Sequence, residues 1–304
     1  MSRVVQLIKR DRYGNDEIVL DVNGPNRGRQ GIKLAEGLEG IYHAPRTSTS
    51  ETSAFFPGSM PGLDRVEERV LKMPLITEET DENCWEDVDS LLWEVMAPGQ
   101  FFVMRVESKD GNHARELNLR RVREPEAAYR HDPNEDGKMK WIVAPVAHDP
   151  WWYAEEFRFT LKRSDMSSTG GNTYAGLIEV ENLGDQDTYL EFVSNQIVTA
   201  ATWTLPDALG RYPAGHKWAG QQVTHTLPQL GPGKEFQVNT HPLIETLLVR
   251  DDSQEWAKMR AEDFEFALPA RTERTQLLVS VKGGAATDEL TVYIRQPYDR
   301  PWGW

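Results

Sequence analysis

The sequence predicts a mainly β protein of two sandwich-like domains, with one α-helix in the first of them. Short segments in which apolar and polar residues alternate recur along the chain, separated by turn residues at intervals of about ten positions. Helical periodicity is clear in one segment, so alternating strands and helices are not indicated. A chain of 304 residues, 39% of them hydrophobic, is long enough for two domains with separate cores.

A β-hairpin is predicted in the first domain. Its first strand has an apolar face formed by Phe102, Met104 and Val106. Asp110-Gly111 is a dipeptide typical of tight hairpin turns, and a second strand follows over 115–123.

Two further hairpins are predicted in the second domain from the same alternation. One joins Ile178 and Val180 to Leu190 and Phe192 through a turn at 182–185. The other uses Gly283-Gly284 as its turn and joins a strand containing Leu277, Val279 and Val281 to a strand containing Leu290, Val292 and Ile294.

The predicted helix is amphipathic. Its apolar side chains recur at three- to four-residue spacing, at Trp85, Val88, Leu92 and Val95 or Met96. Thr80 or Asp81 provides a cap at the start, and Pro98-Gly99 ends the helix.

The domain boundary is expected where Ser, Gly and Asn residues cluster, at about 163–173, which gives domains 1–165 and 166–304. The Ser/Thr-rich stretch 47–53, flanked by Pro45 and Pro57, is typical of a long exposed loop.

Charge and composition exclude several classes of protein. Lys and Arg total 34 against 48 Asp and Glu, a net charge of −14, which disfavours nucleic acid as a partner. The apolar runs are far shorter than the roughly 20 residues of a spanning helix, so no membrane insertion is expected. Met1–Arg10 lacks a long apolar signal region, which predicts no secretory signal. The single cysteine, Cys84, excludes an intramolecular disulfide.

The sequence contains no intact catalytic or metal-binding motif. Residues 132–137 match the opening of a calcium loop, but its twelfth position is Val143 instead of a bidentate Glu, so a polar turn is favoured over a calcium site. The seven histidines are scattered, and no G-x-S-x-G elbow occurs. We expect no enzyme activity, no cofactor and no metal. A hydrolase that uses two of the many carboxylates is the least favoured hypothesis.

Opposite charges lie on neighbouring segments and predict a contact between copies of the chain. The acidic helix carries Asp87 and Asp89, and the following segment carries Arg120, Arg121 and Arg123. The simpler interpretation is a solvated helix face with acidic residues near its N-terminus.

The ten tryptophans suggest contact surfaces. Because adjacent residues of a strand point to opposite faces, at most one of Trp151 and Trp152 enters a given core. We expect the closing segment to dock against the protein, and candidate assembly contacts therefore include Trp151, Trp152, Arg300, Trp302 and Trp304. Aromatic rings also stack on sugars, for which Trp152 and Trp218 are the candidate glycan contacts.

The order of these segments resembles the distal tail proteins, often called minor tail proteins, of long-tailed bacteriophages, most closely those of phages that infect actinobacteria. The similar stretches in the first half are VEERVLKMPLIT (66–77), the helix before Pro98-Gly99, the hairpin 100–123 and IVAPVAHDPWWY (142–153). Those in the second half are GKEFQVNTHPLIETLLV (233–249), residues 266–269 and the closing QPYDRPWGW.

The resemblance implies a structural virion protein. Its first domain would form a homohexameric ring between tail tube and tail tip, and its second would be a galectin-like sandwich. The implied partners are sister copies, the tail tube protein, the tip hub and other minor tail proteins, at the tip of a virion assembled in the host cytoplasm. The alternative function is a carbohydrate-binding module that recognises host cell-wall glycan during adsorption. The family has no catalytic residue to transfer, and a head-to-tail contact between protomers can close into a ring.

Overall fold

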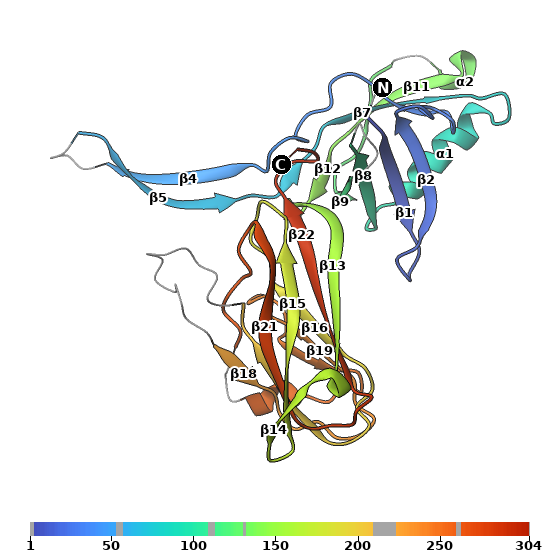
Figure 1. Ribbon diagram of the computed structural model, residues 1–304. Helices are drawn as coiled ribbons and strands as arrows, with labels where there is room; N and C mark the ends of the chain where they lie inside the picture. The colour runs from blue at the N-terminus through green and yellow to red at the C-terminus, as the bar shows by residue number, and fades with distance from the viewer. Residues whose placement is uncertain are drawn as a thin grey trace. The chain divides into compact units, whose positions relative to one another are not determined.

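The computed structural model describes residues 3–52, 57–108, 113–129, 132–208, 223–259 and 263–303, which form several β-sheets (Figure 1). The chain divides into two units, one made of Met1–Ala154 with Tyr298–Trp304 and the other of Glu155–Pro297. The predicted mainly β class is confirmed.

The first sheet of unit 1 contains the predicted hairpin. Its antiparallel order is β2 (Asp16–Asn23), β1 (Val5–Arg10), β8 (Phe101–Glu107) and β9 (Ala114–Arg121), and β9 also pairs with β12 (Pro145–Ala147), which pairs with β6 (Arg69–Val70). Phe102 lies opposite Leu119 and Met104 opposite Leu117, so the pairing of β8 with β9 is confirmed. The predicted turn at Asp110-Gly111 lies outside the described residues.

The second sheet and the helix complete the core of unit 1. The sheet order is β10 (Glu126–Ala127), β11 (Lys138–Val143), β7 (Met73–Glu78) and β3 (Ile32–Leu34), and α2 (Pro133–Asp136) precedes β11. Helix α1 (Trp85–Val95) buries Val88, Leu92 and Val95 in one apolar cluster with residues of both sheets. The helix is confirmed, but its N-cap residue is Cys84, not Thr80 or Asp81. Thr80 Oγ1 instead accepts a hydrogen bond from Asn83 N in the preceding turn.

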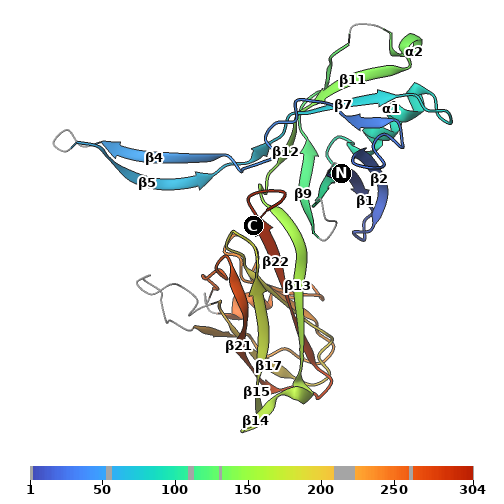
Figure 2. The same ribbon diagram turned by 45° about the horizontal axis from the view of Figure 1, so that its top comes forward.

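The stretch predicted to be a long loop is instead a β-hairpin. Strands β4 (Arg46–Thr52) and β5 (Ser59–Val66) pair antiparallel from Arg46 opposite Val66 to Thr52 opposite Ser59. We call the paired strands β4 and β5 the arm. It forms a sheet of its own and extends away from the other strands of unit 1 in both ribbon views (Figures 1 and 2).

Unit 2 is a sandwich of two antiparallel sheets around one apolar core. One sheet has the order β13 (Trp152–Lys162), β22 (Glu289–Tyr298), β16 (Leu190–Ser194), β19 (Phe236–Asn239), β20 (Leu247–Val249). The other has the order β14 (Ser167–Gly170), β15 (Thr173–Asn182), β21 (Thr272–Gly283), β17 (Ala201–Pro206), β18 (Thr224–Thr226). The 3₁₀ turns η1 (Arg163–Asp165) and η2 (Glu255–Met259) lie beside them.

Neither hairpin predicted for the second domain forms. β15 pairs with β21, whereas β16 pairs with β22 and β19, so both predicted connections cross from one sheet of the sandwich to the other. The alternation does identify the buried faces of these strands, because Ile178, Val180, Leu190 and Phe192 are all buried. Alternation reports which face of a strand is buried, but it does not report which strand lies beside it.

The closing segment belongs to unit 1. Tyr298 and Trp302 pack on the core of unit 1, although β22 forms part of the sandwich of unit 2. The structural division at Ala154 and Glu155 also differs from the predicted boundary at 165/166. The Ser- and Gly-rich stretch that suggested that boundary forms β14, the edge strand of a sheet in unit 2.

Candidate assembly surface

The arm is exposed to solvent along nearly all of its described length. Every described side chain of β4 and β5 is solvent-exposed except half-buried Val66. Met60 and Leu63 are 74% and 87% exposed, although side chains of this kind usually lie inside proteins. The arm therefore presents apolar side chains to solvent in this chain.

Two isolated strands are poorly stabilised in water, because a hairpin without a buried apolar face is at best marginally stable. Within the described ranges, β4 and β5 pair only with each other, so each has one edge whose backbone groups lack strand partners. Such an edge pairs readily with another chain unless a protein protects it. The outer edge of β2, by contrast, is covered by a side chain of its own chain. Gln30 Oε1 accepts a hydrogen bond from Asp21 N, and Gln30 Nε2 donates one to Val19 O.

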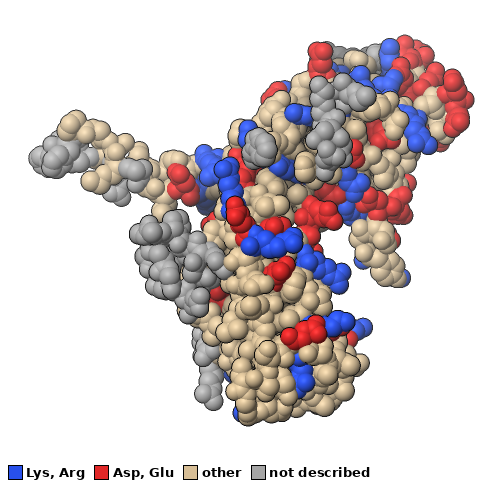
Figure 3. Space-filling view, viewed as in Figure 1, with Lys and Arg blue, Asp and Glu red and all other residues tan. Residues whose placement is uncertain are grey.

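The two aspartates predicted to form an acidic contact surface have different surroundings. Asp87 is exposed on α1. Figure 3 shows acidic side chains gathered at the right-hand end of unit 1, where Figure 1 draws α1. The Asp89 carboxylate accepts hydrogen bonds from Nε1 of Trp93 and of Trp141, both at 2.7 Å, and from Thr77 Oγ1 at 3.3 Å. Asp89 is half-buried and accepts hydrogen bonds within its own chain, because half-buried indole N–H groups require an acceptor; its part in a contact surface stays a prediction.

Two of the three arginines of the predicted basic patch, Arg120 and Arg121, lie beside aromatic rings of their own chain. The Arg121 guanidinium is 5.1 Å from the ring of Trp93, and that of Arg120 is 5.8 Å from the ring of Phe101. Phe101 and Arg123 are exposed. Arg121 thus contacts the helix of its own chain, and Arg123 with Phe101 is the part of this patch most open to a partner.

Trp152 is not a surface residue. It is 0% exposed and lies in the core of unit 1. Its assignment to an assembly interface and to a glycan contact is therefore wrong, because the strand alternation turns Trp152 inward and its neighbour outward. Trp151 is half-buried, with the Arg46 guanidinium 5.9 Å from its ring, at the base of the arm.

Trp302 and Arg300 attach the closing segment to unit 1. The Arg3 guanidinium lies 3.6 Å from the Trp302 ring centre, and Tyr42 meets the same indole edge-on at 5.5 Å. Arg115 donates hydrogen bonds to Arg300 O at 2.8 Å and Gly303 O at 2.6 Å. These contacts are intramolecular and occupy much of the segment. Two other predicted contacts, Trp304 and Trp218, lie outside the described residues.

The outer face of the first sheet carries a closed network of four charges. Arg10 pairs with Asp16 at 3.0 Å and Glu116 at 2.8 Å, and Arg105 pairs with Asp16 at 2.9 Å and Glu116 at 2.7 Å. Burial acts to raise the pKa of Asp16, but hydrogen bonds from Arg10 and Arg105 outweigh it and hold that pKa below its ordinary value. Because the network is neutral as a whole, it offers little net charge to a partner.

The described residues contain no cluster of three or more His, Cys, Asp or Glu side chains that could hold a metal ion. Asp132, which opens the calcium-like stretch, instead caps α2 by accepting a hydrogen bond from Asn134 N at 2.9 Å. Across those same parts of the chain, no helix is both long and apolar enough to span a membrane.

Comparison with known proteins gives relatives in phage tails. No family model matches the chain. Minor tail protein Gp27 of Mycobacterium phage D29 is 21% identical over 317 residues, which cover 91% of this chain and 93% of the relative. The protein of the same name from Mycobacterium phage L5 is 20% identical with the same coverage.

Solved structures from phage adsorption assemblies share the fold. The SPP1 Dit (gp 19.1) protein, described as a paradigm of the hub adsorption apparatus in phages that infect Gram-positive bacteria, matches with a TM-score of 0.58 and 11% identity, over 97% of this chain and 99% of its own. A chain of the phage P2 baseplate in its activated conformation matches with a TM-score of 0.54 and 11% identity, over 99% of this chain and 100% of its own. The predicted resemblance to phage distal tail proteins is confirmed. Together the matches support a structural role in a virion tail.

The arm is the feature that sequence reasoning missed. Thr47, Thr49 and Thr52 are β-branched and favour extended backbone, which was the available signal. The stretch nevertheless lacks a buried apolar face, and strand prediction relies on that face.

Proposed function

We propose that the chain is a structural protein whose copies form a homohexameric ring at the distal end of a phage tail, where it joins tail tube to tail tip. The observation that carries this proposal is that minor tail proteins match the chain in sequence, and a hub protein and a baseplate protein match it in fold, each over nearly its whole length. Both units therefore take part in the resemblance, and the relatives are named for structural roles rather than for a reaction.

The arm is the proposed contact between neighbouring copies. A head-to-tail contact places an element of one copy on a different surface of the next, and six such contacts close if the rotation between copies divides the circle. An arm with open strand edges and exposed Met60 and Leu63 is suited to this role, because docking would pair the edges and bury the apolar side chains. Asp87 and Arg123 are the predicted charged contacts that remain exposed.

Further partners follow from the ring position. The tail tube protein would bind one face of the ring, and the tip hub with other minor tail proteins would bind the opposite face. Assembly would take place in the host cytoplasm before release of the virion. A specific contact of each kind should bury at least about 1,000 Å² in total.

The test is the assembly state of the purified full-length chain, alone and mixed with tube protein. Light scattering gives the mass, and negative-stain images classified by symmetry show a ring. In the matched variant, called armless below, Asn-Gly replaces residues 47–65 and links Arg46 to Val66. These two residues face each other at the base of the arm, and Asn-Gly favours a tight turn. The control is Leu243→Ala, which changes an 88% exposed apolar residue in unit 2.

The wild type and the control should form six-fold rings, and the armless variant should remain monomeric and still unfold cooperatively on heating, which shows that the rest of the chain is folded. A wild type that stays monomeric under both conditions would refute the ring. A ring formed equally well by the armless variant would refute the role of the arm alone.

The alternative function, recognition of a host cell-wall glycan, gains nothing from the two residues first assigned to it. Trp152 is buried and Trp218 lies outside the described residues. Another tryptophan of unit 2, Trp256, is 50% exposed and is a better candidate for contact with a sugar.

A further inference from the structure

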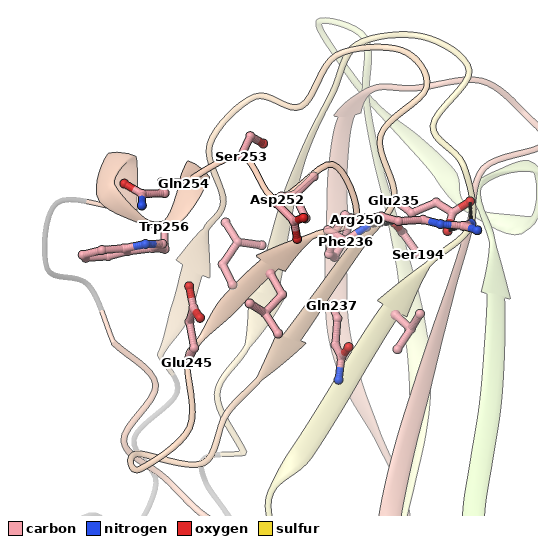
Figure 4. A pocket seen from close by; sticks show the side chains of 14 residues that line it. Ser194, Glu235, Phe236, Gln237, Glu245, Arg250, Asp252, Ser253, Gln254 and Trp256 are labelled. Atoms are coloured by element: carbon pink, nitrogen blue, oxygen red, sulfur yellow. Dashed lines mark hydrogen bonds and ion pairs between the residues drawn. The ribbon is translucent and has the colours of Figure 1, made fainter. Parts of the chain in front are cut away.

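Unit 2 has a pocket of about 530 Å³ between its edge strand β20 and the turn η2. Trp256, on η2, is 50% exposed and lines the pocket. In Figure 4, Trp256 and Glu245 lie at one end, and the Arg250–Glu235 pair lies at the other. The pocket thus joins an open aromatic surface to several polar side chains.

The turn that carries Trp256 is stabilised by hydrogen bonds of the neighbouring residue, Glu255. Glu255 is buried, and its carboxylate accepts hydrogen bonds from Lys234 Nζ at 2.7 Å and Lys258 Nζ at 2.6 Å. Lys234 also donates to Ser253 Oγ at 3.0 Å. The hydrogen bonds from Lys234 and Lys258 hold the pKa of Glu255 below its ordinary value, so the carboxylate is charged at neutral pH. The backbone turn that carries Trp256 is therefore ordered before a ligand binds, so binding costs little conformational entropy there.

Three polar side chains of the pocket, Arg250, Glu235 and Gln237, have hydrogen-bond partners. Arg250 Nη1 binds both oxygens of Glu235, at 2.8 and 2.7 Å, and Gln237 Nε2 donates to Glu191 Oε1 at 2.8 Å. Planar carboxylate, amide and guanidinium groups offer both donors and acceptors for hydroxyl groups. A preformed pocket with an aromatic surface and a few placed polar groups is typical of a small-ligand site.

We propose that this pocket binds a neutral oligosaccharide, with one sugar ring stacked on the Trp256 indole and its hydroxyl groups bound by the polar side chains around it. Three acidic residues line the pocket, Glu235, Glu245 and Asp252, against one cation, Arg250, which is already paired with Glu235. This excess of negative charge disfavours uronates and phosphosugars.

A peptide added as an extra strand is a poorer fit. β20 has only three residues, Leu247–Val249, which is too short an edge for strand addition to provide much affinity. The proposed sugar site goes beyond the structural role in the tail and does not depend on ring formation.

The experiment uses the full-length chain on a printed array of neutral hexose and N-acetylhexosamine oligosaccharides, with uronate-containing oligosaccharides as charge controls. Titration calorimetry with the strongest soluble ligand then compares the wild type, Trp256→Ala, Trp256→Phe and Leu278→Ala. Leu278 is a matched control because it is 58% exposed in unit 2 on β21, in the other sheet. Circular dichroism checks the fold of each variant, and light scattering records its assembly state.

Trp256→Ala should weaken binding about tenfold or more, Trp256→Phe should retain part of it, and Leu278→Ala should leave it unchanged. An array without any neutral ligand, a preference for uronates, or affinity that survives Trp256→Ala would each overturn the proposal. A Trp256→Ala variant that alters association between copies and leaves sugar binding intact would identify the pocket as a protein contact. Because light scattering measures assembly and calorimetry measures sugar binding, the experiment distinguishes a wrong sugar-site proposal from a wrong ring proposal.

Discussion

Replacing Arg69 with alanine should destabilise unit 1 by about 3–5 kcal/mol. This side chain is 0% exposed, and its guanidinium donates four hydrogen bonds to backbone carbonyl oxygens. The acceptors are Pro150 at 2.9 Å, Gly40 at 3.1 Å, Ile41 at 2.9 Å and Asp299 at 2.7 Å. Arg69 thus joins three separate stretches of unit 1, including the closing segment.

The magnitude follows from what the substitution leaves behind. Burial lowers the pKa of Arg69 to about 10, with Asp299 acting in the opposite direction, so the group remains charged at neutral pH. A hydrogen bond to a charged group contributes roughly 1.5–3 kcal/mol, but the four do not add, because alanine also removes the cost of burying the cation. Arg69→Lys should recover only part of the loss, since one ammonium group cannot reproduce the planar fork.

The assay is urea unfolding of the full chain combined with hydrogen exchange, which separates the two units. Amides near residues 40–44, 150 and 299 should lose protection in Arg69→Ala, while those of β15 and β21 in unit 2 should not. Lys72→Ala is the control, because Lys72 is 52% exposed, lies outside the arm and forms an ion pair with exposed Glu39 at 3.0 Å, so its effect should stay within about 1 kcal/mol. An Arg69→Ala variant within about 1 kcal/mol of the wild type would refute the reasoning.

Two further predictions concern other charged groups of unit 1. Asp89→Lys should lower the free energy of unfolding in urea by about 2–4 kcal/mol, because it removes the hydrogen-bond acceptor of the Trp93 and Trp141 indoles. Asp87→Lys, at an exposed position, should lower it by less than about 0.5 kcal/mol. Equal losses would show that the two aspartates do not differ in this way. Asp16→Asn should lower the melting temperature at about pH 6, and the difference from wild type should narrow as the pH falls below about 4. Although burial acts to raise the pKa of Asp16, hydrogen bonds from Arg10 and Arg105 hold it below the ordinary value, so its contribution is present above that value and is lost as the carboxylate is protonated. A difference that stays constant down to about pH 2.5 would show that Asp16 does not contribute in this way.

Local patterns predicted the buried side chains well. The alternation over β15 and β16 identified four side chains that are buried, and the three-to-four spacing over α1 identified its buried face. These patterns succeed because burying one face of a strand or helix leaves a periodic record in the sequence itself. The acidic excess likewise follows from composition alone.

Among the candidate site residues, local pattern performed less well. Trp151 and Trp152 were known to point to opposite faces, yet only the packed core decides that Trp152 is the buried one. The sequence places Asp89 among the acidic residues of α1 but does not show that it accepts hydrogen bonds from Trp93 and Trp141. Trp141 lies on β11, far from Asp89 in the chain, so only the fold brings the two together. Trp256 had no distinguishing sequence context, because its support by buried Glu255 depends on Lys234, which is distant in the chain.

The sequence by itself determined that this is a mainly β chain with one amphipathic helix and an acidic surface, because strand and helix periods and net charge are properties of neighbouring residues and of composition. Only the tertiary structure decided that the connections after β15 and β21 cross between sheets, that β4 and β5 form an arm, and that Trp302 packs on unit 1. Strand pairing and docking join residues far apart in the chain. The free energy of pairing and docking depends on which two surfaces come into contact, and the sequence pattern of one segment does not specify its partner.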